Sequence, residues 1–197
     1  MLLYDYPDSG NCFKVRLLFA HLGIAYERRE VYPFDFAQKR DLLADLNPVR
    51  RLPVVVLDNG RSLAESNAIL FFFAEGSDYL PSDPYGRAQV VQWLCFEQFS
   101  HQPNLATARV WRRGGTPPMP EEREKRMRDG ERALVAMDRY LGDRRFFVDD
   151  HYSIADIALY AYTHVANEGG FSLAGYPAVR AWLDRVAGQP GYIPISA

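Results

Sequence analysis

The sequence contains few cysteines, almost no net charge and no long apolar run. Cys12 and Cys95 are its only cysteines, and neither lies in a Cys-X-X-Cys or other metal-ligand pattern. We therefore expect no disulfide framework and no metal site, and a reducing, cytoplasmic location. Lys and Arg number 23 against 25 Asp and Glu, a formal net charge of −2. This balance gives no support for a nucleic-acid or membrane partner.

Long hydrophobic segments are missing as well. No apolar stretch approaches the ~20 residues that a transmembrane helix requires. Residues 1–7 read Met-Leu-Leu-Tyr-Asp-Tyr-Pro, without a basic region followed by a long apolar one, so we expect a first strand and not a signal peptide. With 197 residues and 48% hydrophobic residues, the chain is long enough for one or two globular domains with a sizeable core.

The first 76 residues predict a compact α/β domain. Alternating or apolar runs predict strands, and amphipathic runs bounded by turn residues predict helices. The expected order is β-α-β-α-β-β-α. It consists of strands at 2–6 and 26–32, helices at 12–22 and 36–46, two strands flanking Asn59-Gly60, and a helix opened by Glu65 and Ser66.

The remainder of the chain predicts an all-α domain. Residues 77–85 form a turn-rich linker, and no confident strand pattern follows in 86–197. Helices are expected at 86–112, where Pro103 is expected to kink or split the helix, and at 121–141. Ser153 to Asp156 resembles a capping box before an apolar helix, and Pro177 opens a last helix.

The most informative stretch is residues 52–75. Pro53 removes a backbone donor where strand pairing begins, so it belongs at a strand start, as a trans or a cis proline. Asn59-Gly60 is a strong hairpin signal. Ser66 can accept a hydrogen bond from an N–H of the helix it starts, and the unpaired N–H groups there suit a carboxylate. Together these features indicate a site for a small, zwitterionic, peptide-like ligand.

This combination resembles the cytosolic glutathione S-transferase family over essentially the whole chain. Leu52-Pro53-Val54 is similar to the family's cis-proline segment, and Glu65-Ser66 to its acid–hydroxyl pair. Ser153-Ile154-Ala155-Asp156 resembles the capping box of its second domain. Ser9-Gly10-Asn11-Cys12 falls where serine- and cysteine-type members carry their catalytic residue. The resemblance implies a thioredoxin-like first domain (βαβαββα) followed by an all-α domain.

The resemblance also implies a function and a set of ligand contacts. The implied activity is conjugation of glutathione to a small hydrophobic electrophile by a homodimer. Leu52, which precedes Pro53 in the cis-proline segment, would pair its backbone with the cysteinyl part of glutathione, and Glu65 and Ser66 would bind its γ-glutamyl end. Arg50 or Lys39 would hold its glycyl carboxylate. Residues implied for the electrophile pocket are His101, Asn104, Arg109 and Trp111.

Catalysis of this type stabilises the glutathione thiolate, because a free thiol is mostly protonated at neutral pH. A hydrogen bond donated to sulfur favours the anion. Ser9 is the favoured donor, with Asn11 and a chemical role for Cys12 as alternatives. Two other functions stay open: a non-catalytic binding or interaction module of the same fold, and a glutathione-dependent thiol–disulfide reductase that uses Cys12.

Overall fold

The first of two units is built on a four-stranded mixed sheet. A computed structural model describes residues 1–197, which divide into Met1–Ser77 with Pro190–Ala197, and Asp78–Gln189. The strand order is β2-β1-β3-β4, with β1 parallel to β2 and the other pairs antiparallel. The strands are β1 (Leu2–Asp5), β2 (Glu27–Glu30), β3 (Val54–Val56) and β4 (Ser62–Ala64). The predicted βαβαββα order is confirmed.

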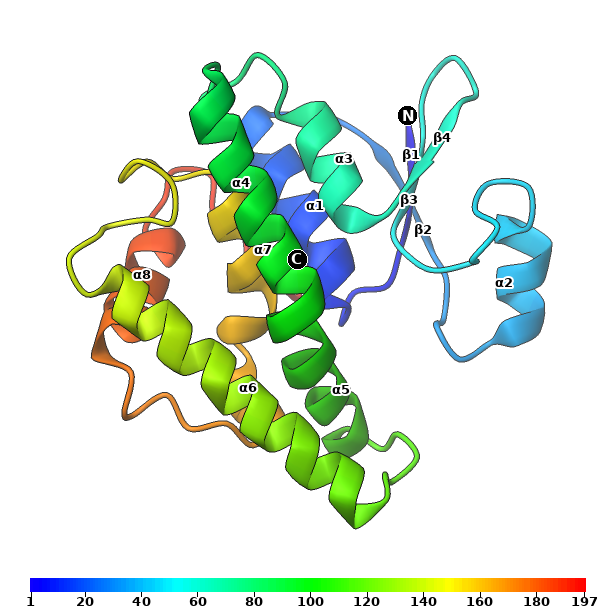
Figure 1. Cartoon of the computed structure of the whole chain (residues 1–197). Coiled ribbons are helices and arrows are strands. Elements are labelled where there is room, and N and C mark those ends of the chain that lie inside the picture. The colour runs from blue at the N-terminus through cyan, green and yellow to red at the C-terminus, as the bar shows by residue number, and fades with distance from the viewer. The chain divides into compact units, whose positions relative to one another are not determined.

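Three helices cover the two faces of this sheet. They are α1 (Gly10–Leu22), α2 (Phe36–Leu43) and α3 (Ser66–Phe73). Figure 1 shows α1 and α3 side by side on one face and α2 on the other. Because successive strand residues point to opposite faces, neighbouring β1 residues enter different cores. Leu3 packs with α1 and α3 through Val15, Phe19 and Ile69, and Tyr4 packs with Leu43 of α2.

The segment between α2 and α3 contains the two turn features expected from the sequence. The Leu52–Pro53 peptide bond is cis, directly before β3. Residues 57–61 connect β3 to β4, and Gly60 has a φ of 81°, which glycine adopts without strain. The hairpin places β4 so that the chain enters α3 immediately after Ala64.

The second unit is helical, as predicted. Its elements are α4 (Pro84–Phe96), the π-helix η1 (Glu97–His101), α5 (Gln102–Arg112), α6 (Pro120–Leu141), α7 (Ile154–Thr163), the 3-10 helix η2 (Ala166–Gly169) and α8 (Pro177–Ala187). The expected interruption near Pro103 takes the form of η1. Proline lacks the N–H that would continue the α-helix, and the Gln102 N–H bonds instead to the Glu97 carbonyl, five residues earlier.

The capping box at the start of α7 is confirmed. The Ser153 side chain accepts a hydrogen bond from a backbone N–H at the start of the helix, and the Asp156 carboxylate accepts from the Ser153 N–H at 3.0 Å. The same buried carboxylate accepts from Trp182 Nε1 at 2.9 Å and from the Phe147 N–H at 3.2 Å. Asp156 therefore ties α7, α8 and the loop at Phe147 together.

One domain boundary differs from the expectation. The second domain was expected to extend to residue 197, but Pro190–Ala197 belongs to the first unit. Arg16 Nη2 donates to the Ile195 carbonyl at 2.6 Å, and His21 Nδ1 lies 2.9 Å from the Pro190 carbonyl oxygen. Two polar contacts to α1 thus hold this segment. None of the helices combines the length and apolar character needed to cross a bilayer.

Candidate functional site

The start of α1 presents Ser9 and Asn11. Ser9 has extended backbone geometry, and its hydroxyl oxygen accepts from the Cys12 N–H at 3.3 Å as the N-cap of α1. The cap uses the acceptor side of this hydroxyl, so the cap itself does not take up the hydroxyl hydrogen. Ser9 and Asn11 are both partly exposed. The helix start therefore offers a hydroxyl donor and an amide at its accessible edge.

The start of α3 lies next to the start of α1. Glu65 precedes the helix with a φ of 66° and an exposed side chain that makes no capping bond. Ser66 is the first helical residue, and its hydroxyl donates to Asn11 Oδ1 over 3.5 Å. Ser66 was expected to cap α3 with its hydroxyl; instead the hydroxyl points to α1, and the backbone N–H groups of the first turn are left for an anion.

A buried lysine supports this pair of helix starts. Lys14 is 0% exposed, and its Nζ donates to Ser66 Oγ and to Asn67 Oδ1, each at 3.3 Å. Lys14 was not among the predicted site residues. A lysine inside an apolar helix run was the only available signal, and its partners lie 52 and 53 residues away in the sequence.

Cys12, the third catalytic candidate, lies in the interior. Its side chain is 0% exposed, and burial, with the neighbouring Asp5 carboxylate as a second cause, raises the pKa of its thiol to about 12. A redox or nucleophilic cysteine needs access and a low thiol pKa. Both properties of Cys12 therefore argue against a chemical role, and they favour a packing role.

The loop before the cis-proline carries Arg50. The buried Asn47 side chain holds this loop: its Nδ2 donates to the Arg51 carbonyl at 3.0 Å, and its Oδ1 accepts from the Val49 N–H at 3.0 Å. Arg50 is exposed, with a φ of 54°. Lys39 on α2 is half-buried, and its Nζ donates to the Pro33 carbonyl at 3.3 Å. The exposed Arg50 is therefore the better placed of the two to meet a ligand carboxylate.

Two of the four residues expected in an electrophile pocket serve the interior of the helical unit. His101 is 0% exposed, and its Nε2 lies 2.8 Å from Thr163 Oγ1 of α7. Arg109 is 6% exposed, and its Nε donates to Glu168 Oε2 at 2.8 Å. These two contacts join helices to one another. They therefore explain the buried positions of His101 and Arg109 without a ligand.

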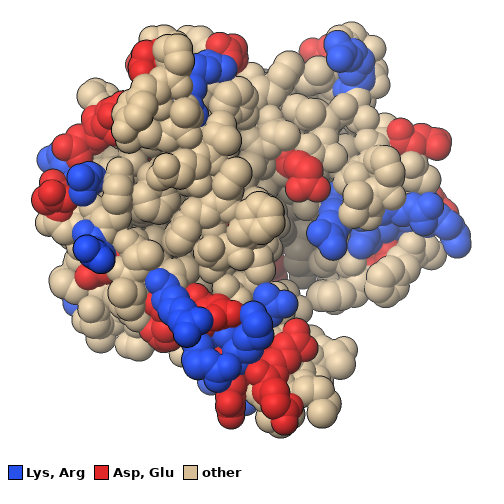
Figure 2. Space-filling model, viewed as in Figure 1, with Lys and Arg blue, Asp and Glu red and all other residues tan.

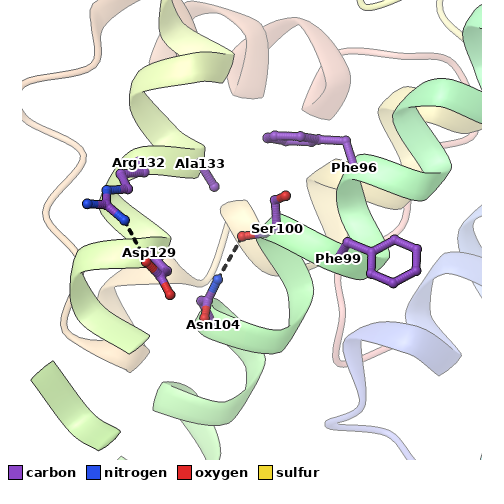
Figure 3. A pocket seen from close by; sticks show the side chains of 7 residues that line it. All are labelled: Phe96, Phe99, Ser100, Asn104, Asp129, Arg132 and Ala133. Atoms are coloured by element: carbon purple, nitrogen blue, oxygen red, sulfur yellow. Dashed lines mark hydrogen bonds and ion pairs between the residues drawn. The ribbon is translucent and has the colours of Figure 1, made fainter. Parts of the chain in front are cut away.

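The other two residues line separate cavities. Asn104 lies in a cavity of about 300 Å³ between the η1–α5 segment and α6, where its Nδ2 donates to the Ser100 carbonyl at 2.7 Å. Phe96 and Phe99 are its aromatic residues, and Figure 3 shows Phe99 directed away from the other lining side chains and the Asp129–Arg132 ion pair at the edge. Trp111 lines a second cavity of about 160 Å³. Asn104 and Trp111 thus line different cavities of the second unit, and their place in an electrophile pocket stays a prediction.

The first unit, taken alone, can hold an anion and stabilise a negative charge. The starts of α1 and α3 meet through Asn11 and Ser66, and helix N-termini favour negative groups. Glu65 adds one exposed carboxylate beside them. No group of three or more His, Cys, Asp or Glu residues is placed to hold a metal ion. Figure 2 shows that α6 carries charges of both signs, as expected of a solvated helix face.

Comparison with known proteins identifies relatives over both units. Residues 8–75 match the family model "Glutathione S-transferase, N-terminal domain", and residues 102–190 match "Glutathione S-transferase, C-terminal domain". A crystal structure of glutathione S-transferase from Pseudomonas fluorescens Pf-5 is 45% identical, with a TM-score of 0.91 and 98% of each chain covered. Glutathione S-transferase U19 of Arabidopsis thaliana is 29% identical over 94% of this chain and 84% of its own. Elongation factor 1-gamma of Artemia salina is 28% identical over 84% of this chain and 40% of its own.

Proposed function

The chain belongs to the glutathione S-transferase family, and from this premise we propose that it conjugates glutathione to a small hydrophobic electrophile. The observation that carries the proposal is the Ser9 hydroxyl at the start of α1, beside Asn11 and the contact to Ser66. A member that only bound its ligand would not need a donor at the thiol. In this proposal the start of α3 binds glutathione, and the start of α1 activates its thiol.

Glutathione fits the polar groups of the first unit end by end. The N–H groups that open α3 suit the α-carboxylate of its γ-glutamyl residue, and the exposed Glu65 suits the ammonium beside that carboxylate. The backbone of Leu52, next to the cis-Pro53, would pair with the cysteinyl residue. Arg50 would bind the glycyl carboxylate, with Lys39 as the second candidate.

Ser9 would lower the pKa of the bound thiol by donating its hydroxyl hydrogen to the sulfur. Asn11 is the second candidate donor. The thiol proton leaves to solvent, the sulfur lone pair forms a bond to the electrophilic carbon, and a leaving group departs with its bonding electrons. A hydrogen bond to a charged group contributes about 1.5–3 kcal/mol, which corresponds to about tenfold or more in rate.

The test is conjugation of a chromogenic chloronitrobenzene by the wild type, Ser9→Ala and Ser9→Thr. We expect Ser9→Ala to lose about tenfold or more in kcat/KM, and Ser9→Thr to retain much of the activity because it keeps both the hydroxyl and the helix cap. Ser82→Ala, at an exposed position of the second unit, is the matched control and should not change activity.

Calorimetry with glutathione separates this proposal from the alternatives. Binding without conjugation would indicate a binding module, a function compatible with the similarity to elongation factor 1-gamma. Absence of binding at millimolar glutathione would contradict both. Thiol–disulfide reductase activity that is lost in Cys12→Ala but kept in Ser9→Ala would support the third function, against which the burial of Cys12 argues.

Homodimer formation belongs to the same proposal. Val91, Cys95 and Phe99 follow one another at four-residue spacing along α4 and η1, and all three are exposed, Phe99 by 83%. Such a stripe suits burial against a second copy. Sedimentation of the wild type and of Phe99→Glu would test this, since a charge in the stripe should weaken association.

A further inference from the structure

The site contains a residue whose position is not explained by packing alone. Lys14 lies in the middle of the apolar helix α1, is 0% exposed, and donates to Ser66 Oγ and Asn67 Oδ1. Burial of an ammonium group is costly unless hydrogen bonds compensate. Both of these partners lie in the first turn of α3, where the proposed γ-glutamyl carboxylate would bind.

The chemistry of lysine gives the resulting hydrogen-bond chain a direction. An ammonium group has three donors and no acceptor, whereas a serine hydroxyl has one hydrogen and two acceptor sites. Lys14 therefore fixes Ser66 Oγ as an acceptor on the side that faces the Lys14 ammonium group. The single Ser66 hydrogen is then directed elsewhere, and in this structure it is donated to Asn11 Oδ1 over 3.5 Å.

The contact to Asn11 links the chain to the catalytic end of the site. Asn11 Oδ1 faces Ser66, and because the two polar atoms of an amide diverge from one carbon, Asn11 Nδ2 is directed away from Ser66. The order of groups is thus ammonium, hydroxyl, amide oxygen, amide nitrogen. The Lys14 ammonium end is buried, and the amide nitrogen of the partly exposed Asn11 is the donor at the end that a ligand can reach.

We propose that Lys14 is a positioning residue that keeps the Ser66 hydroxyl oriented as a hydrogen donor, and so selects ligands that carry a carboxylate at the start of α3. This inference rests on the proposed function. The 3.5 Å contact between Ser66 and Asn11 lies at the long limit of a hydrogen bond, so an arriving carboxylate replaces it at little cost. The new bond is charge-assisted and stronger. Without Lys14 the hydroxyl is free to rotate, and its lone pairs can face the carboxylate.

The experiment compares two ligands that differ only in that carboxylate. The ligands are glutathione and γ-aminobutyryl-cysteinylglycine, titrated by calorimetry into the wild type and Lys14→Met. We expect Lys14→Met to weaken glutathione binding about tenfold or more and to change binding of the analogue by less than about twofold. Lys125→Met, on the exposed face of α6, is the matched control and should bind both ligands like the wild type.

Ser66→Ala provides a second route if Lys14→Met fails to fold. This variant removes the hydroxyl but keeps Lys14, and it should show the same selective loss for glutathione. Where both single variants fold, the double variant should lose no more glutathione affinity than either single variant. The reason is that each of the three variants interrupts the same hydrogen-bond chain. Equal weakening of both ligands, or no weakening of either, would overturn the role of Lys14. Absence of glutathione binding by the wild type would instead remove the proposed function itself.

Discussion

Arg16 Nη1 donates to both carboxylate oxygens of Asp5, at 2.7 and 2.8 Å, and both side chains are buried. Arg16 Nη2 donates to the carbonyl of Pro7 at 2.8 Å, in the turn that leads to Ser9. One ion pair therefore anchors the end of β1, the body of α1 and the turn before the catalytic candidate. The buried Arg16 guanidinium therefore holds the turn that leads to Ser9, although it is too deeply buried to contact a ligand itself.

Loss of this anchor should destabilise the first unit. A wholly unpaired buried charge costs about 3–5 kcal/mol, but Asp5 keeps a second ion-pair partner, Arg28, so Arg16→Met is expected to lower the free energy of unfolding by less than this amount. Urea unfolding followed by circular dichroism measures it. Arg40→Met, in the exposed Arg40–Asp41 pair, should leave the midpoint nearly unchanged. Equal midpoints for the two variants would show that the buried pair has no special role.

The two cysteines should differ in reactivity. Cys95 is exposed, whereas Cys12 is buried and has a raised thiol pKa. Because the thiolate is the reactive species, iodoacetamide at pH 8 should alkylate Cys95 and leave Cys12 unmodified in folded Phe99→Glu, the variant in which a second copy should not cover Cys95. Peptide mass spectrometry detects the sites, and a sample unfolded in guanidinium should be labelled at both. Rapid labelling of Cys12 in the folded protein would revive its candidacy as a reactive residue.

The sequence predicted the fold well because local signals agreed with one another. The alternation of β1, the turn at Gly60 and the capping box at Ser153 each depend on a few neighbouring residues, and each lies where it was expected. Lys14 and Arg16 were missed because the groups that satisfy them come from other elements. A pattern along α1 cannot show that α3 and residue 195 supply those groups.

The electrophile-pocket residues stay a prediction, because the family resemblance alone assigned them. The helical pattern over 86–112 contains the π-helix η1 before Pro103, and η1 accommodates an extra residue in its turn. One additional residue rotates everything beyond it by about 100° relative to an uninterrupted α-helix. Helical periodicity in the sequence therefore cannot assign the faces of Asn104, Arg109 and Trp111, which all follow this turn.

Asp156 should make stability depend on pH. Burial raises the pKa of its carboxyl from 3.8 to about 6, although Trp182 and Ser153 donate to it. Between about pH 4 and 6 the folded state therefore holds a proton that the unfolded state has lost, and the contribution of this group to stability falls as the pH rises through that window.

The comparison with Asp156→Asn isolates this effect, because asparagine does not titrate. The free energy of unfolding of the wild type relative to the variant should increase as the pH is lowered from 7 to 4, by at most about 3 kcal/mol. Chemical unfolding at several pH values measures the difference. A difference that stays constant with pH would show that the carboxyl keeps its ordinary pKa.

Gly130 in the middle of α6 should not tolerate alanine. A Cβ at this position would lie 2.5 Å from Cε1 and Cζ of Phe171, whose ring is 1% exposed and has little room to move. The gain in helix propensity from glycine to alanine, about 1 kcal/mol, is opposed by an overpacking cost of about 1–3 kcal/mol. We expect Gly130→Ala to lower the thermal midpoint, and Phe171→Leu in the same chain to recover part of the loss. Gly175→Ala, where a Cβ meets nothing within 4 Å, is the matched control. A higher midpoint for Gly130→Ala would show that α6 and the Phe171 ring separate easily.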